Sequence, residues 1–210
     1  MTPIPDKRPP RTDAKRNRER LIKAATEAFA ERGIDVSIAE IAQRAGVGKG
    51  TVFRHFAAKG GLVAAIMGQI IDSLIATCRE LDEINDDPSV ALRQFMTAGV
   101  ELLARNRALC DVIGRPSLQY PAVRVGVDRL CDTVDALTTR ARDAGVIRQD
   151  VTGQDIVLLL SGINQAAAPL ADSQPNLWLR YLALIVDGLQ TETPHALPHP
   201  SPRPFSVDWG

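Results

Sequence analysis

A short stretch in the first third of this 210-residue sequence constrains the fold most strongly, because its residues fit two brief helices joined by a tight turn. Ser37, followed three residues later by Glu40, forms a capping-box pattern that predicts a helix over residues 38–44. Residues 45–47, Ala-Gly-Val, predict a tight turn, and a second short helix is expected over residues 48–56. Two short helices joined in this way make a helix-turn-helix.

Helical periodicity extends on both sides of this motif. A helix is expected over residues 13–32, and Gly33 supplies a stop after it. Only 4% of the chain is aromatic, so Leu, Ile, Val and Ala must fill most of the core, and few segments alternate apolar with polar residues. The sequence therefore predicts an all-α fold. Further helices are expected over residues 58–84, 89–105, 106–113, 120–144, 153–168 and 176–190.

Charge divides the chain into a basic head and an acidic body. Residues 1–60 contain 13 Lys/Arg and 7 Asp/Glu, a net charge of +6, whereas residues 61–210 contain 12 and 18, a net charge of −6. A basic head is typical of a module that binds a polyanion, although a solvated basic tail would give the same count. We expect a disordered basic arm over 1–12, a three-helix head over 13–57, a helical ligand-binding and dimerisation body over 58–190, and a disordered Pro-rich tail over 191–210.

The segment from Arg20 to Leu62 closely resembles the DNA-binding head of the TetR family of transcriptional regulators. The matching residues are Ala25, Phe29, Gly33, Ser37, Ile41-Ala42, Ala45-Gly46-Val47, Lys49-Gly50-Thr51, Phe53, His55-Phe56, Lys59 and Leu62. Three positions depart from the family pattern: Gly48 stands where Ser is frequent, Phe53 where Tyr is common, and Gly60-Gly61 where acidic residues often begin the linking helix.

The resemblance implies a cytoplasmic homodimer that binds double-stranded DNA at a pseudo-palindromic operator. It also implies a repressor, released from the operator when the body binds a small apolar or amphipathic effector. A DNA-binding scaffold that recruits a protein and has no ligand pocket is the alternative.

Residues of the second short helix and its surroundings are the candidates for contact with DNA. Lysines and hydroxyls there can hold phosphates, which sets register, while outward side chains read bases. Val52 is expected to contact a thymine methyl, and Arg54 to pair with guanine O6 and N7. Val52 and Phe53 are also candidate anchors in the core, and His55 has an alternative role in packing. The candidate DNA-binding residues are Ser37, Gly48, Lys49, Thr51, Val52, Phe53, Arg54, His55 and Lys59.

The last two expected helices are apolar around much of their circumference, which favours a dimer interface, with burial inside one subunit as the alternative. The candidate interface residues are Leu159, Ile163, Leu177, Leu182, Ile185 and Leu189. A ligand pocket should be an apolar cavity between helices with a few polar groups. For each single lining residue, ordinary core packing is the favoured alternative. The candidate lining residues are Met67, Ile71, Phe95, Met96, Leu103, Cys110, Tyr120, Val127, Cys131 and Gln165.

Other functional classes have little support. Residues 46–51, Gly-Val-Gly-Lys-Gly-Thr, resemble the end of a nucleotide-binding loop, but position 43 is Gln and a capped helix precedes it where a buried strand is required. No combination of Ser, His and acid and no metal-ligand spacing is found, so no catalytic residue, metal or cofactor is expected. The three cysteines are expected to be reduced core residues, and no apolar run suggests association with a membrane.

Overall fold

The computed structural model describes residues 11–33, 35–105, 120–190, 193–202 and 204, and every regular element in these ranges is helical. The all-α prediction is therefore confirmed. The helix expected over 106–113 lies outside the described residues. The chain divides into two compact units, residues 1–66 and 67–210. This division falls inside the long fourth helix, whereas the sequence placed a boundary just before that helix.

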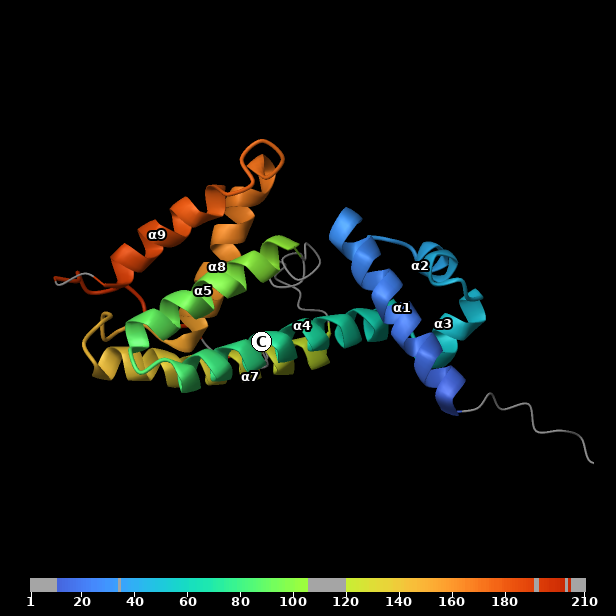
Figure 1. Ribbon diagram of the computed structural model, residues 1–210, viewed down its shortest axis with the longest axis horizontal. Coiled ribbons are helices and arrows are strands. Elements are labelled where there is room, and N and C mark those ends of the chain that lie inside the picture. Colours follow the sequence, from blue (N-terminus) through green and yellow to red (C-terminus); the bar gives the residue numbers. More distant parts are fainter. Residues whose placement is uncertain (1–10, 34, 106–119, 191–192, 203, 205–210) are drawn as a thin grey trace, which may run out of the picture. The chain divides into compact units, whose positions relative to one another are not determined.

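The first unit contains three helices and the beginning of a fourth. These are α1 (Arg11–Arg32), α2 (Ile38–Ala45), α3 (Lys49–His55) and the start of α4 (Lys59–Ile84). In Figure 1, α2 and α3 lie along the same side of α1. The core of this unit is made by the apolar face of α1 and by residues of the other helices. Its buried members include Leu21, Ala25, Phe29, Ile41, Val52, Leu62 and Ile66.

The second unit contains the rest of α4 together with α5 (Pro88–Arg105), α7 (Pro121–Asp143), α8 (Gly153–Ala167), a short 3-10 turn η1 (Ala168–Leu170) and α9 (Leu177–Leu189). Helix α8 packs against α5, α7 and α9, so it forms the centre of the unit. Arg140 of α7 donates to the backbone oxygens of Asp82 (2.6 Å) and Asn85. These bonds satisfy carbonyls near the C-terminus of α4 that no longer have a partner within the helix.

The close approach of α8 to α7 depends on Gly153. Its backbone N–H donates to the carboxylate of Asp135 at 2.8 Å, and Thr152 forms a complete capping box with Asp155. A Cβ at position 153 would lie 2.3 Å from the carbonyl oxygen of Cys131 and 2.5 Å from the backbone nitrogen of Asp135. Because backbone atoms cannot move aside as a flexible side chain can, only glycine allows this contact.

Helix α4 qualifies the expectation that no stretch is apolar enough to cross a membrane. By length and composition it could do so, with a mean hydropathy of 1.7 over 18 residues. Half of that stretch is buried inside the protein, and its C-terminal end is tied to α7 through Arg140. These contacts are those of a core helix.

The described part of the C-terminal tail packs against the second unit, which corrects the prediction that the whole tail is disordered. Arg148 donates to the backbone oxygen of His195 at 2.6 Å. The hydroxyl of Ser201 donates to Asp155 at 3.1 Å, at the N-terminus of α8. Residues 1–10 of the predicted basic arm lie outside the described residues, and residues 11–12 already belong to α1.

Two cysteines confirm the prediction of reduced core thiols. Cys78 and Cys131 are free and buried, while Cys110 lies outside the described residues. Burial raises the pKa of both thiols to about 12, and neighbouring aspartates contribute in the same direction. Neither thiol therefore provides a thiolate near neutral pH, which is the form that reacts as a nucleophile.

Replacing Gly153 with Ala tests the contact between α7 and α8. We expect Gly153→Ala to lower the free energy of unfolding by at least about 2 kcal/mol, because the added methyl group meets backbone. Gly68→Ala in α4 is the control, since no atom lies within 4 Å of its Cβ position. That change should stabilise the protein by up to about 1 kcal/mol through helix propensity. Equal urea midpoints for the two variants would contradict this explanation.

Candidate DNA-binding surface

The helix-turn-helix forms at the predicted residues. The hydroxyl of Ser37 accepts from the backbone N–H of Glu40 at 3.2 Å and caps α2. The carboxylate of Glu40 pairs with Arg32 of α1, so only the serine half of the predicted capping box forms. Gly46 ends α2 in the left-handed region, at φ 64°, and its N–H donates to Gln43. A side chain at position 46 would be strained, which explains why the turn requires glycine.

Helix α3 has one buried and one exposed side. Val52 is 1% exposed and Phe56, which follows the helix, is 5% exposed, so both side chains belong to the core. Lys49 and Arg54 are exposed, and Phe53 is 53% exposed. Thr51, His55 and Lys59 are half-buried, and Ser37 and Gly48 are exposed.

Val52 corrects the prediction that this residue reads a thymine methyl. Its side chain is enclosed in the first unit and cannot reach a base edge. Positions 52 and 56 are one helical turn apart, so the same contacts that anchor Phe56 draw Val52 inward. Phe53, for which both roles remained open, is the apolar residue that faces outward.

The cations of the first unit fall into two groups. Arg44 of α2 donates to Glu31 of α1 at 3.0 Å, and this hydrogen bond holds the pKa of the Glu31 carboxyl below its usual range. Arg18 lies 5.5 Å from the ring centre of Phe56. Within the part of the chain that the structure describes, Lys49 and Arg54 have no acidic partner. These two charges are thus free to contact an anion outside the protein.

The two glycines beside Lys49 leave the start of α3 uncovered. Apart from the adjoining residues and the backbone of α3 itself, no described atom lies within 4 Å of the Cβ position of either Gly48 or Gly50. Gly48 has φ −74°, an ordinary value for any residue, and no side chain caps the helix there. The departure from Ser at position 48 therefore removes a cap but does not change the backbone, and it permits a close approach of another molecule.

The predicted dimer residues do not share one face. Ile163, Leu182 and Leu189 are buried within the chain itself, which contradicts their assignment to an interface with a second chain. The other three, Leu159, Leu177 and Ile185, are half-buried. Leu179, 46% exposed, and Leu184, 56% exposed, are the exposed leucines of α9. Periodicity could not separate the faces because α9 is apolar on both.

Most of the predicted pocket residues pack in the core of the second unit. Those that are buried are Met67, Ile71, Phe95, Met96, Leu103, Val127 and Cys131. Tyr120 is half-buried before α7, and Cys110 lies outside the described residues. Gln165 is exposed and donates to the hydroxyl of Ser161 at 3.2 Å, so it does not face the interior as predicted.

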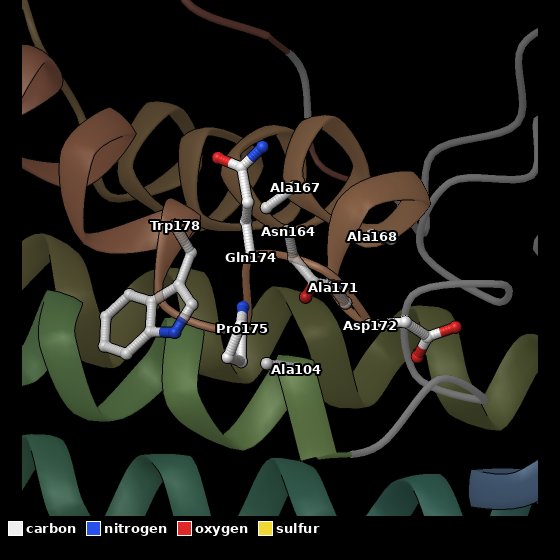
Figure 2. Close-up of a pocket in the computed structure, with 9 residues that line it drawn as sticks. All are labelled: Ala104, Asn164, Ala167, Ala168, Ala171, Asp172, Gln174, Pro175 and Trp178. Carbon is white, nitrogen blue, oxygen red and sulfur yellow. The ribbon is translucent and has the colours of Figure 1, made fainter.

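A cavity of about 330 Å³ lies where α5 ends, α8 meets η1, and α9 begins. Asn164, a buried polar residue of α8, lines this cavity, whereas its neighbour Gln165 does not. The full set of described lining residues is Ala104, Asn164, Ala167, Ala168, Ala171, Asp172, Gln174, Pro175 and Trp178. Figure 2 shows the Trp178 indole and the Asp172 carboxylate at opposite ends of this group.

Comparison with known families gives a match for each unit. Residues 21–66 match the family described as "Bacterial regulatory proteins, tetR family". Residues 87–191 match "Transcriptional regulator SbtR-like, C-terminal domain". An HTH-type transcriptional regulator of Staphylococcus aureus strain USA300 is 34% identical over 113 residues, which are 52% of this chain and 61% of the relative. The match thus spans about three fifths of the length of such curated relatives.

Solved structures extend the likeness over most of the chain. A TetR regulatory protein from Mycobacterium vanbaalenii is 32% identical, with 87% of this chain and 100% of that chain covered and a TM-score of 0.56. A TetR regulator from Streptomyces coelicolor is 25% identical, with 84% and 99% covered and a TM-score of 0.60. FadR from Bacillus subtilis, solved in complex with stearoyl-CoA, shares the fold at 20% identity, with 81% and 98% covered and a TM-score of 0.66.

The matched segments coincide with the elements described above. The first contains the helix-turn-helix, and the second contains α5, α7, α8 and α9. Both units are matched, and a regulator that is 32% identical aligns with 87% of this chain and with 100% of its own length. The chain therefore belongs to the TetR family of helix-turn-helix transcriptional regulators.

Proposed function

We propose that this protein is a cytoplasmic, homodimeric repressor that leaves its operator when a small amphipathic molecule binds in the second unit. It acts by binding rather than by catalysis. The observation that carries the proposal is the outer side of α3. Lys49 and Arg54 are exposed there and have no acidic partner among the described residues, while Arg44, in the same unit, is held by Glu31. Positive charge without an internal partner, on the second helix of a helix-turn-helix, suits a major groove and its phosphates.

Two different tasks are assigned to these two cations. Lys49 precedes the open position Gly50 and carries a point charge, which suits a backbone phosphate. Arg54 lies in the last turn of α3 and carries a planar guanidinium, which suits the paired acceptors O6 and N7 of guanine. Lys49 thus supplies affinity without sequence preference, and Arg54 supplies sequence preference.

Dimerisation is assigned to the exposed apolar face of α9. Leu179 and Leu184 are each about half exposed in the single chain, and neither is needed for its core. A second copy that covered this face would bury both side chains. Two heads in one dimer could then read two half-sites about one DNA turn apart, which a single short helix cannot do.

The cavity beside Trp178 is assigned to the effector. Alanines and the indole supply apolar walls, and Asn164 supplies a polar group on the central helix α8. An amphipathic molecule could pack its apolar part against the alanines and the indole and form a hydrogen bond with Asn164. The stearoyl-CoA bound by FadR belongs to a structure only 20% identical, so it is no guide to the ligand of this chain. A scaffold with no small-molecule ligand is the alternative, and the cavity favours the effector-binding regulator.

The division of roles on α3 can be measured with DNA. Lys49→Ala should weaken binding to all duplexes alike and reduce the salt slope of log K by about 2 for the dimer, because each of the two subunits loses one phosphate contact. Arg54→Ala should relax base preference at one position by about 1–3 kcal/mol. Arg44→Ala is the control, because its charge is held by Glu31, and it should leave the salt slope unchanged. Fluorescence anisotropy over a salt series provides the measurement, and equal salt slopes for Lys49→Ala and Arg44→Ala would refute the assignment.

The dimer assignment predicts a change in mass. Leu184→Glu should shift the molecular mass in light scattering from twice 22.7 kDa to 22.7 kDa and keep the helical circular dichroism, because this side chain is exposed within the chain. Val125→Glu, at a similar exposure on α7, should remain a dimer. A Leu184→Glu protein that stays dimeric would exclude this face of α9.

The effector cavity can be followed by fluorescence. In a Trp209→Phe background, Trp178 is the single tryptophan, so its emission reports on the cavity. A compound from an apolar and amphipathic library that shifts this emission should also weaken operator binding, and operator DNA should weaken compound binding by the same factor. Couplings of this kind are about 5- to 150-fold.

A blocked variant decides whether that response comes from this cavity. Ala168→Leu should abolish both the fluorescence response and operator release by filling the space. Ala136→Leu, exposed on α7 and outside the lining, should respond normally. Release with equal potency in both variants would place the effector site elsewhere.

A further inference from the structure

An exposed phenylalanine stands out on the surface of the first unit. Phe53 is 53% exposed, and among the described residues of that unit it is the one large apolar side chain in this state. Large apolar side chains are usually withdrawn from water, because exposure of their surface is unfavourable. The position of Phe53 beside Arg54 makes this exposure relevant to the proposed contact with DNA.

The local sequence keeps the ring of Phe53 uncovered. Side chains on a helix lean toward the preceding turn, which for position 53 contains Lys49 and Gly50. Gly50 has no side chain, and no described atom beyond the adjoining residues and the backbone of α3 lies within 4 Å of where its Cβ would be. The inner side of the helix is already taken by Val52 and Phe56. About half of the Phe53 side chain therefore stays exposed among the residues that the structure describes.

Chemistry limits what such a ring can recognise in a major groove. Phenylalanine has no hydrogen-bond donor, so it cannot hold a phosphate as Lys49 can. Among the groups displayed at base edges, the apolar one is the C5-methyl of thymine. The two flanking cations hold the helix against the polyanion, and this contact would remove water from the ring and the methyl group together.

We propose that Phe53 is a specificity-determining residue that selects a thymine in each operator half-site through contact with its C5-methyl group. This inference rests on the proposed DNA-binding function. It assigns to Phe53 the role that the sequence analysis gave to Val52, which is buried. The contact of Phe53 with thymine is apolar, so it is separate from the hydrogen bonds to guanine that are assigned to Arg54.

Replacing thymine with deoxyuridine tests the proposal, because this change removes the methyl group and leaves every hydrogen-bonding group in place. The full-length protein first selects duplexes from a random-sequence pool. Each thymine of the selected half-site is then replaced in turn, in both half-sites together, and the dissociation constant is measured by fluorescence anisotropy at fixed salt. At one position we expect a loss of about fourfold per methyl group, or about fifteenfold for the pair.

Protein variants link that loss to the side chain. Phe53→Ala should bind the thymine and deoxyuridine duplexes equally, whereas Phe53→Leu should keep part of the discrimination. Lys49→Ala is the matched control on the same helix: it should weaken binding to both duplexes and leave their ratio unchanged. An unchanged melting temperature for Phe53→Ala is expected, because the side chain is exposed.

Each result decides the matter. Discrimination that disappears in Phe53→Ala and persists in Lys49→Ala supports the inference. A selected half-site without thymine, a loss below about 1.5-fold at every thymine, or discrimination retained by Phe53→Ala overturns it while leaving DNA binding intact. A pool from which no duplex is enriched overturns the proposed function and this inference together.

Discussion

The burial of Val52 and Phe56 is the contact on which the DNA-binding surface depends. A helix of seven residues such as α3 is not stable alone in water, because too few hydrogen bonds offset the cost of nucleation. Its two inward side chains supply the missing stability and fix the rotation of the helix about its axis. That rotation directs Lys49, Phe53 and Arg54 away from the core.

The second unit is organised by a comparable close contact, made by backbone rather than by side chains. Gly153 allows the N-terminus of α8 to reach the backbone of α7, and Asp135 accepts its N–H. Helix α8 is thereby placed between α5, α7 and α9. The inner residues of α8, including Ile163, are buried by contacts within the chain itself. The exposed leucines of α9 remain available to contact another molecule.

Charge in the first unit is distributed by the same packing. Helices α1 and α2 are close enough for Glu31 to hold Arg44 and for Glu40 to hold Arg32. Exposed ion pairs of this kind contribute little to stability. These ion pairs neutralise Arg32 and Arg44, which lie on α1 and α2, and they leave the cations of α3 available for DNA. The net charge of the head alone cannot reveal which arginines are free.

The sequence by itself determined the all-helical class, the positions of the helices, the cap at Ser37 and the turn at Gly46. These features depend on neighbours within about four residues, so periodicity and caps are sufficient to predict them. Only the tertiary structure decided which faces are inside: Val52 rather than Phe53 on α3, Asn164 rather than Gln165 on α8, and Leu182 and Leu189 rather than Leu184 on α9. The physical reason is that an apolar residue at helical spacing suits a core and an interface equally well, and only contact with another helix distinguishes them.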